Sequence, residues 1–230
     1  MTAATVAAVL AVGAVAGLDL VSVPQAMLGR PLVAGFLGGL VAGSPLAGLA
    51  TGAVLELFAF ETLPVGASRY PDWGPAAAAS GALAAQRGGA WDAAWMAGIM
   101  VVALVFAWLG GFGMLLVRRL NAGHLRRRLA ALESGDHRAL LALQVGGIAR
   151  DLVRAAVATG LTLWIGGRVA RHVELGWRAP HALADVAVVG TALGVAVWSA
   201  WRLFGNGKAR GWLAAGAVAG VALVAGMLAW

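Results

Sequence analysis

The sequence predicts an all-α, polytopic membrane protein. Of its 230 residues, 61% are hydrophobic and only 12% are charged, and the mean hydropathy is +0.84. A typical soluble domain is about half apolar and about a quarter charged, so this chain has too few polar side chains to cover a globule in water. Three long apolar runs approach or exceed the ~20 residues that a helix needs to cross a bilayer. They are residues 93–117, 179–201 (with one Asp) and 211–230.

The first apolar segment covers residues 2–18. No Lys or Arg precedes it, whereas a cleaved secretory signal carries a basic region before its apolar core. We therefore expect residues 2–18 to be retained as the first membrane element.

The rest of the N-terminal half, up to residue 90, is apolar but repeatedly interrupted by Gly and Pro. The pieces between these breaks in 28–90 are about a dozen residues long, shorter than a bilayer requires. Broken backbone at membrane depth is tolerated only where protein buries it or water reaches it. The pattern predicts helices around residues 30–66 that enter and leave the membrane on one side, as at transporter binding sites. Closely spaced glycines such as Gly35, Gly39 and Gly43 also indicate helix-packing faces, and both interpretations are compatible.

The C-terminal half, residues 91–230, has the pattern of conventional transmembrane helices within the same single membrane domain. Its hydrophobic segments lie near residues 93–117, 145–167, 180–201 and 211–229.

A polar stretch near residues 118–141 separates the first two of these segments. Six Arg residues lie between Arg118 and Arg138, with leucines interleaved at close to helical spacing. This combination is typical of an amphipathic helix on the membrane surface, and its positive charge predicts a cytoplasmic location. The net charge of +7 comes mostly from Arg residues at the ends of apolar runs, where they set the orientation of a membrane protein. We therefore expect no nucleic-acid partner.

Ionisable residues inside the broken region are the strongest indication of a functional site. A carboxylate at the bilayer centre costs roughly 2.5–3.5 kcal/mol, so such groups face a cavity or a partner. Glu56 is the clearest case, because the preceding 25 residues carry no charge. It either accepts hydrogen bonds from substrate hydroxyls or forms a gating or structural ion pair with Arg30. The other charges in or beside this region are Asp19, Glu61, Arg69 and Asp72.

Enzymatic and metal-binding motifs are not found in the sequence. There is no cysteine, no H-E-x-x-H, no G-x-S-x-G and no G-x-x-x-x-G-K-[ST]. The four His residues lie in or beside predicted loops without metal-ligand spacing. We therefore predict no catalytic residue, no metal site and no cofactor.

Residues 30–72 resemble the signature region of the mannose/sorbose-family IIC membrane subunits of the sugar phosphotransferase system. The segments that carry the resemblance are Arg30-Pro31-Leu32-Val33-Ala34-Gly35, Gly52-Ala53-Val54-Leu55-Glu56-Leu57, Val65-Gly66-Ala67 and Pro71-Asp72. Upstream, Asp19 and Gln25 fall where family members tend to carry polar residues.

The resemblance implies a permease subunit of the bacterial inner membrane. It would work as an oligomer with a IID membrane subunit and with cytoplasmic IIA and IIB proteins that carry phosphohistidine. It would bind a hexose and carry no phosphorylated residue of its own. The substrate-binding residues so implied are Asp19, Gln25, Glu56, Gly66 and Asp72. Arg30, Glu61 and Arg69 would form ion pairs or a gate.

Three positions differ from the family pattern: Ser44, Arg69 and Pro64, which stands where a polar or small residue is usual. The first two concern charge. Ser44 stands where an Asp is usual, and Arg69 adds a charge before Pro71-Asp72. They motivate an alternative, a membrane scaffold or sensor derived from the family that no longer transports. A third possibility, an unrelated transporter or channel, requires the match to be a coincidence.

For the permease we expect Glu56 and Asp72 to lie on one polar cavity. It would be reached from Gln25 and walled by residues 35–52. Arg69 would plug this cavity if it paired with Asp72 or Glu61.

Overall fold

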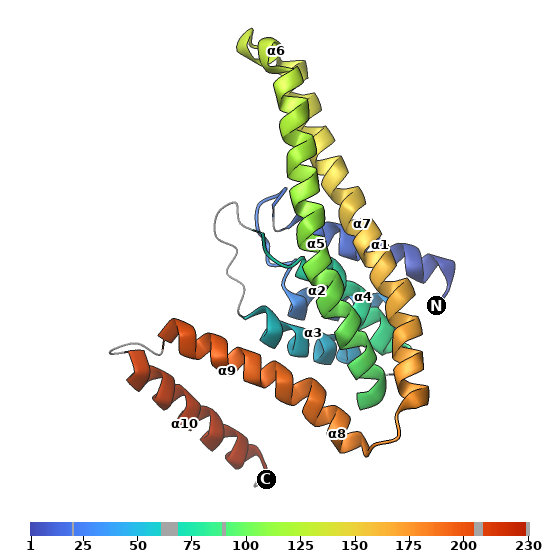
Figure 1. Ribbon diagram of the computed structural model, residues 1–230, viewed down its shortest axis with the longest axis vertical. Helices are drawn as coiled ribbons and strands as arrows, with labels where there is room; N and C mark the ends of the chain where they lie inside the picture. The colour runs from blue at the N-terminus through green and yellow to red at the C-terminus, as the bar shows by residue number, and fades with distance from the viewer. Residues whose placement is uncertain (20, 61–68, 89–90, 205–208, 229–230) are drawn as a thin grey trace.

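The computed structural model describes residues 1–19, 21–60, 69–88, 91–204 and 209–228, and within these ranges it contains helices and no strand. The predicted all-α class is confirmed. Figure 1 shows a body of short helices crossed by two long ones, with the last helices along one side. The elements are α1 (Ala3–Leu18), α2 (Pro31–Val41), α3 (Pro45–Ala59), α4 (Trp73–Ala85), α5 (Ala93–Arg127), α6 (Leu129–Glu133), α7 (His137–Gly176), α8 (His181–Asp185), the π-helical segment η1 (Val186–Gly190), α9 (Thr191–Phe204) and α10 (Ala209–Leu228).

Helices α2 and α3 form a short hairpin in the predicted broken region. They contain 11 and 15 residues, which gives lengths of about 16 and 22 Å at 1.5 Å per residue. Neither length covers the ~30 Å hydrocarbon core of a bilayer. Both helices begin with Pro, and Gly43 makes the turn between them with a φ of +94°. Gly43 is thus a turn residue rather than part of a packing face. The re-entrant placement of the hairpin in the membrane stays a prediction.

Helix α4 lies at the centre of the body. It contacts α1, α2, α3, α5 and α7, and every residue from Gly74 to Ala85 is buried. These residues are nearly all Ala, Gly or Ser, so the neighbouring backbones approach closely. A Cβ on Gly81 would lie 3.0 Å from the Cα of Gly35 in α2. Small side chains at membrane-helix contacts allow this kind of packing. Larger buried side chains, including Leu55, Trp95 and Ile99, complete the core around α4.

Helices α5 and α7 are longer than the predicted spans. With 35 and 40 residues, they measure about 52 and 60 Å, more than the ~40–45 Å of a whole bilayer with its headgroups. They lie side by side, and their ends project beyond the body with α6 at the tip (Figure 1).

The polar stretch 118–141 therefore differs from the expected surface helix. Its first ten residues continue α5, and its last five begin α7. The stretch is rich in Leu, Ala and Arg, which favour helix. It is interrupted only at Arg128, before α6, and by a short turn at residues 134–136. Gly135 takes a φ of +79° there, and Asp136 caps α7 by accepting hydrogen bonds from the N–H groups of Arg138 and Ala139. The helices thus continue past the apolar run.

The side of the membrane on which this tip lies is testable by cysteine labelling, since the chain has no cysteine. Ser134 lies at the tip, and Gly176 ends α7 at its other end with open space around it. We expect an impermeant maleimide to label Gly176→Cys from outside intact cells, and Ser134→Cys only after the membrane is opened. The reverse pattern would show an inverted topology. Labelling of both from one side would show that α7 does not cross.

The last apolar segments are helical as predicted. Among the described residues, two helical stretches are long and apolar enough to cross a membrane, Ala93–Arg127 and His181–Phe204. Helix α9 packs against α3, while α10 contacts α9 and is largely exposed from Arg210 to Gly220.

Candidate functional site

Asp19 organises the loop between α1 and α2. Its side chain is 4% exposed, and its carboxylate accepts hydrogen bonds from the backbone N–H groups of Ala26 (2.6 Å) and Gly29 (3.0 Å). Two such bonds hold the loop in a closed turn, in which Met27 adopts a positive φ of 64°. Asp19 thus fixes the loop that carries Gln25.

Glu56 forms an ion pair with Arg30 across the α2–α3 hairpin. Its second oxygen accepts a hydrogen bond of 3.1 Å from the backbone N–H of Leu32. A carboxylate at this position satisfies a free N–H at the start of α2 and complements the helix dipole. The pair with Arg30, one of the two expected roles, is present. Direct contact of Glu56 with a substrate stays a prediction.

A buried charge network connects α4, α7 and the α1–α2 loop. Asp72, 2% exposed and at the N-terminus of α4, pairs with Arg154 of α7. Arg154 also donates to Asp151 (2.6 Å), whose other oxygen accepts from the Ser22 hydroxyl (2.5 Å). One cation thus joins two carboxylates, all nearly inaccessible. A buried charge is tolerated only when it is paired and hydrogen-bonded, so this network fixes two loops against α7.

A cavity of about 220 Å³ lies between the α1–α2 loop and the segment that precedes α4. Its polar lining comes from Asp19, Gln25 and Arg30, and its aromatic lining from Tyr70 and Trp73. The other residues that line it are Met27, Gly29, Pro31, Ala59 and Pro71.

The arrangement differs in part from the expected cavity. Within the described part of the chain, the wall includes Gln25 but neither Glu56 nor Asp72, and residues 35–52 do not contribute to it. Each of the two carboxylates is instead paired with an Arg, Glu56 with Arg30 and Asp72 with Arg154. Gly66 and Glu61, the remaining predicted substrate-binding and ion-pair residues in this region, lie outside the described residues.

Arg69 does not pair with Asp72. Its guanidinium carbon lies 4.1 Å from the ring centroid of Phe112 and 5.1 Å from that of Trp108, both on α5. Stacking of a cation on aromatic faces is favourable, and it directs Arg69 to α5 rather than to the cavity. The ion pair between Arg69 and Asp72 that was expected to block the cavity is absent. A contact of Arg69 with Glu61 is not described, because Glu61 lies outside the described residues.

Sequence reasoning did not identify Arg154, Ser22, Tyr70 or Trp73 as part of this region. Arg154 lies 82 positions from Asp72, and only the presence of Arg150, Asp151 and Arg154 within the apolar segment 145–167 gave a signal. Charged residues within a transmembrane segment usually face the protein interior and a partner. Applied to α7, that rule would have identified Arg154.

Short paired helices, buried ion pairs and a cavity with a few polar lining residues in an apolar helical body are features of a membrane transport protein. Residues 3–200 match the family described as "PTS system sorbose-specific iic component". The chain belongs to this family of sugar-transporter components of the phosphotransferase system.

Two solved structures share the fold. The first, titled "Structure of membrane protein", is 19% identical with a TM-score of 0.75, and the match covers 100% of this chain and 94% of that one. The second, a cryo-EM structure of the mannose transporter ManYZ in complex with microcin E492, is 20% identical with a TM-score of 0.63 and covers 96% and 87%. A comparison with curated protein sequences gives no match.

Proposed function

We propose that this protein is the sugar-permease subunit of a mannose-family phosphotransferase system in the bacterial inner membrane. It binds a hexose and translocates it, together with a IID membrane subunit, for phosphorylation by a IIB protein that IIA supplies with phosphate. The observation that supports this most directly is the cavity lined by Asp19, Gln25 and Arg30 with Tyr70 and Trp73, next to the region that carries the family resemblance.

The lining of this cavity suits a sugar chemically. The Gln25 amide both donates and accepts hydrogen bonds, and Arg30 donates. Each Asp19 oxygen accepts one bond from the loop backbone and has a further lone pair for a hydroxyl. Charged partners strengthen such bonds. Tyr70 and Trp73 offer apolar ring faces for the C–H side of a sugar, in the mixture of apolar walls and few polar groups that is typical of ligand sites.

Glu56 and Asp72 act on this site through their Arg partners in our proposal. Glu56 holds Arg30, which lines the cavity. Asp72, held by Arg154, fixes the position of Pro71 and Trp73 on either side of it. Both carboxylates are thus positioning residues for the sugar.

Gln25→Ala is expected to weaken hexose binding about tenfold, because it removes the hydrogen bonds of one amide. Equilibrium dialysis with labelled hexoses, mannose and sorbose included, measures this on the protein purified with its IID subunit. Gln144→Ala is the matched control, because Gln144 is an exposed amide on α7 away from the cavity. Equal affinity of the wild type and Gln25→Ala would place the sugar elsewhere.

The same assay separates the two roles of Glu56. If Glu56 acts through Arg30, Glu56→Gln weakens binding no further once Arg30 has been changed to Ala. Additive losses would indicate a direct contact. A wild-type complex that binds no hexose would favour the non-transporting scaffold.

A further inference from the structure

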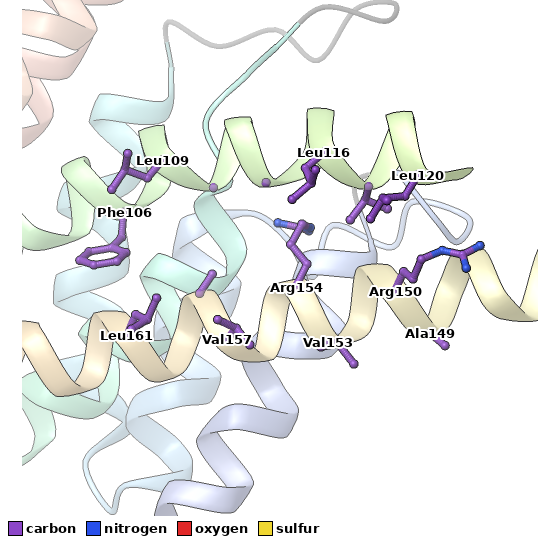
Figure 2. Close-up of a pocket in the computed structure, with 14 residues that line it drawn as sticks. Phe106, Leu109, Leu116, Leu120, Ala149, Arg150, Val153, Arg154, Val157 and Leu161 are labelled. Carbon is purple, nitrogen blue, oxygen red and sulfur yellow. The ribbon is translucent and has the colours of Figure 1, made fainter. Parts of the chain in front are cut away.

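A long groove lies between α5 and α7, separate from the sugar cavity. Its volume is about 640 Å³. Figure 2 shows Phe106 and Leu161 at one end and Leu120, Ala149 and Arg150 at the other. Of its 14 lining residues, twelve are apolar or Gly, and the other two are Arg150 and Arg154.

Apolar side chains along this groove are open to the surroundings. Leu116, Val153 and Val157 are 58%, 61% and 55% exposed, while Gly110 and Gly113 contribute no side chain to fill the space between the helices. Because this is a membrane protein, the medium around such a face is lipid. The groove is therefore shaped for an apolar chain.

Arg150 gives the groove a charged end. Its Nε donates a hydrogen bond of 2.8 Å to the side-chain oxygen of Asn121 on α5, and Figure 2 shows its guanidinium beyond Leu120. Asn121 follows Arg118 and Arg119, the first charges after the apolar run 93–117. Arg residues at the end of an apolar run mark the membrane–water interface. Arg150 thus lies at the level of lipid headgroups.

The length of the groove fits one leaflet. Along α5 it extends from Phe106 to Leu120, which is ~21 Å at 1.5 Å per residue. Half of a bilayer with its headgroups measures about 20–22 Å. A lipid whose phosphate lies at Arg150 therefore places its acyl chain along Val153, Val157 and Leu161.

We propose that this groove is a binding site for an anionic phospholipid. The acyl chain lies between α5 and α7, and the phosphate bonds Arg150, because a guanidinium matches the geometry of phosphate oxygens. Arg154 connects the site to the sugar cavity, since it lines the groove and holds Asp72.

Native mass spectrometry of the full-length protein tests the proposal. The delipidated protein in detergent is titrated with phosphatidylglycerol or phosphatidylcholine of identical acyl chains. We expect the wild type to prefer phosphatidylglycerol about fivefold, which corresponds to one Arg near an anionic headgroup. Arg150→Gln removes this preference and Arg150→Lys retains it. The control Arg138→Gln, an exposed Arg at the other end of α7 from Gly176, leaves it unchanged.

The acyl-chain part is tested by Val157→Trp, which fills the groove from an exposed position. This variant should bind both lipids more weakly, while its thermal unfolding temperature remains that of the wild type. Equal affinity of the wild type for the two lipids, or a preference that persists in Arg150→Gln, overturns the proposal. So does cross-linking of Val153→Cys in native membranes to a IID subunit or a second copy, because a protein helix would then occupy the groove.

Discussion

Arg154→Leu is expected to destabilise the protein by about 3–5 kcal/mol, the usual cost of leaving a buried charge without its partner. Arg154 is the cation for both Asp72 and Asp151, which are 2% and 3% exposed. Its loss leaves two carboxylates facing each other in an apolar body. Thermal unfolding in detergent, followed by circular dichroism, measures the effect.

Changing one of the two carboxylates together with Arg154 makes the test specific. The double variant Arg154→Leu/Asp72→Asn should recover part of the loss, because it removes one of the two unpaired charges. The control is Glu174→Gln, which breaks the Arg87–Glu174 pair on a more exposed surface. Such pairs contribute about 0–1 kcal/mol. A loss in Arg154→Leu no larger than this would show that the network contributes little to stability.

The same residue also bears on the proposed function. Asp72 and Ser22 attach both loops of the proposed sugar cavity to α7 through this network. We therefore expect Arg154→Lys to fold but to bind hexose more weakly, because one ammonium group replaces neither the planar geometry nor the number of donors of a guanidinium.

The fold was predictable from sequence where local composition determines it. The Gly and Pro breaks between residues 28 and 60 correspond to two short helices, because Pro starts helices and Gly43 supplies a conformation that other residues rarely adopt. The apolar runs are helical for the same local reason. The central position of α4 was not predictable, since a run of Ala and Gly has no amphipathic pattern and its burial depends on all its neighbours.

The site was predictable only in part. Asp19, Gln25 and Arg30 line the cavity as a group because they are close in sequence around one loop. The partner of Asp72 was not found, because it depends on the packing of α7 beside α4. Periodicity within one segment carries no information on such distant pairs. The projecting ends of α5 and α7 were missed because charge composition alone does not distinguish a surface helix from the extension of a spanning one.

Gly48→Val is expected to separate the α2–α3 hairpin. A Cβ on Gly48 would lie 2.7 Å from the Cα of Gly39 and 2.9 Å from its nitrogen. These are backbone atoms, which cannot rotate away as a side chain does, so the helices themselves must move apart. Overpacking of this kind costs about 1–3 kcal/mol and occasionally more, and we expect about 3 kcal/mol here because Val adds two further carbons.

The control for this change is Gly194→Val on α9, where a Cβ would meet nothing within 4 Å. Its effect on thermal unfolding should stay within about 0.5 kcal/mol. Separation of α2 from α3 also moves Arg30 away from Glu56, since the pair bridges the two helices. Gly48→Val should therefore lose hexose binding even at temperatures where most helical structure remains, whereas Gly194→Val should retain it. If Gly48→Val unfolds like the wild type, the close approach of the two helices does not hold the hairpin together, and the Arg30–Glu56 pair and the contacts with α4 must do so instead.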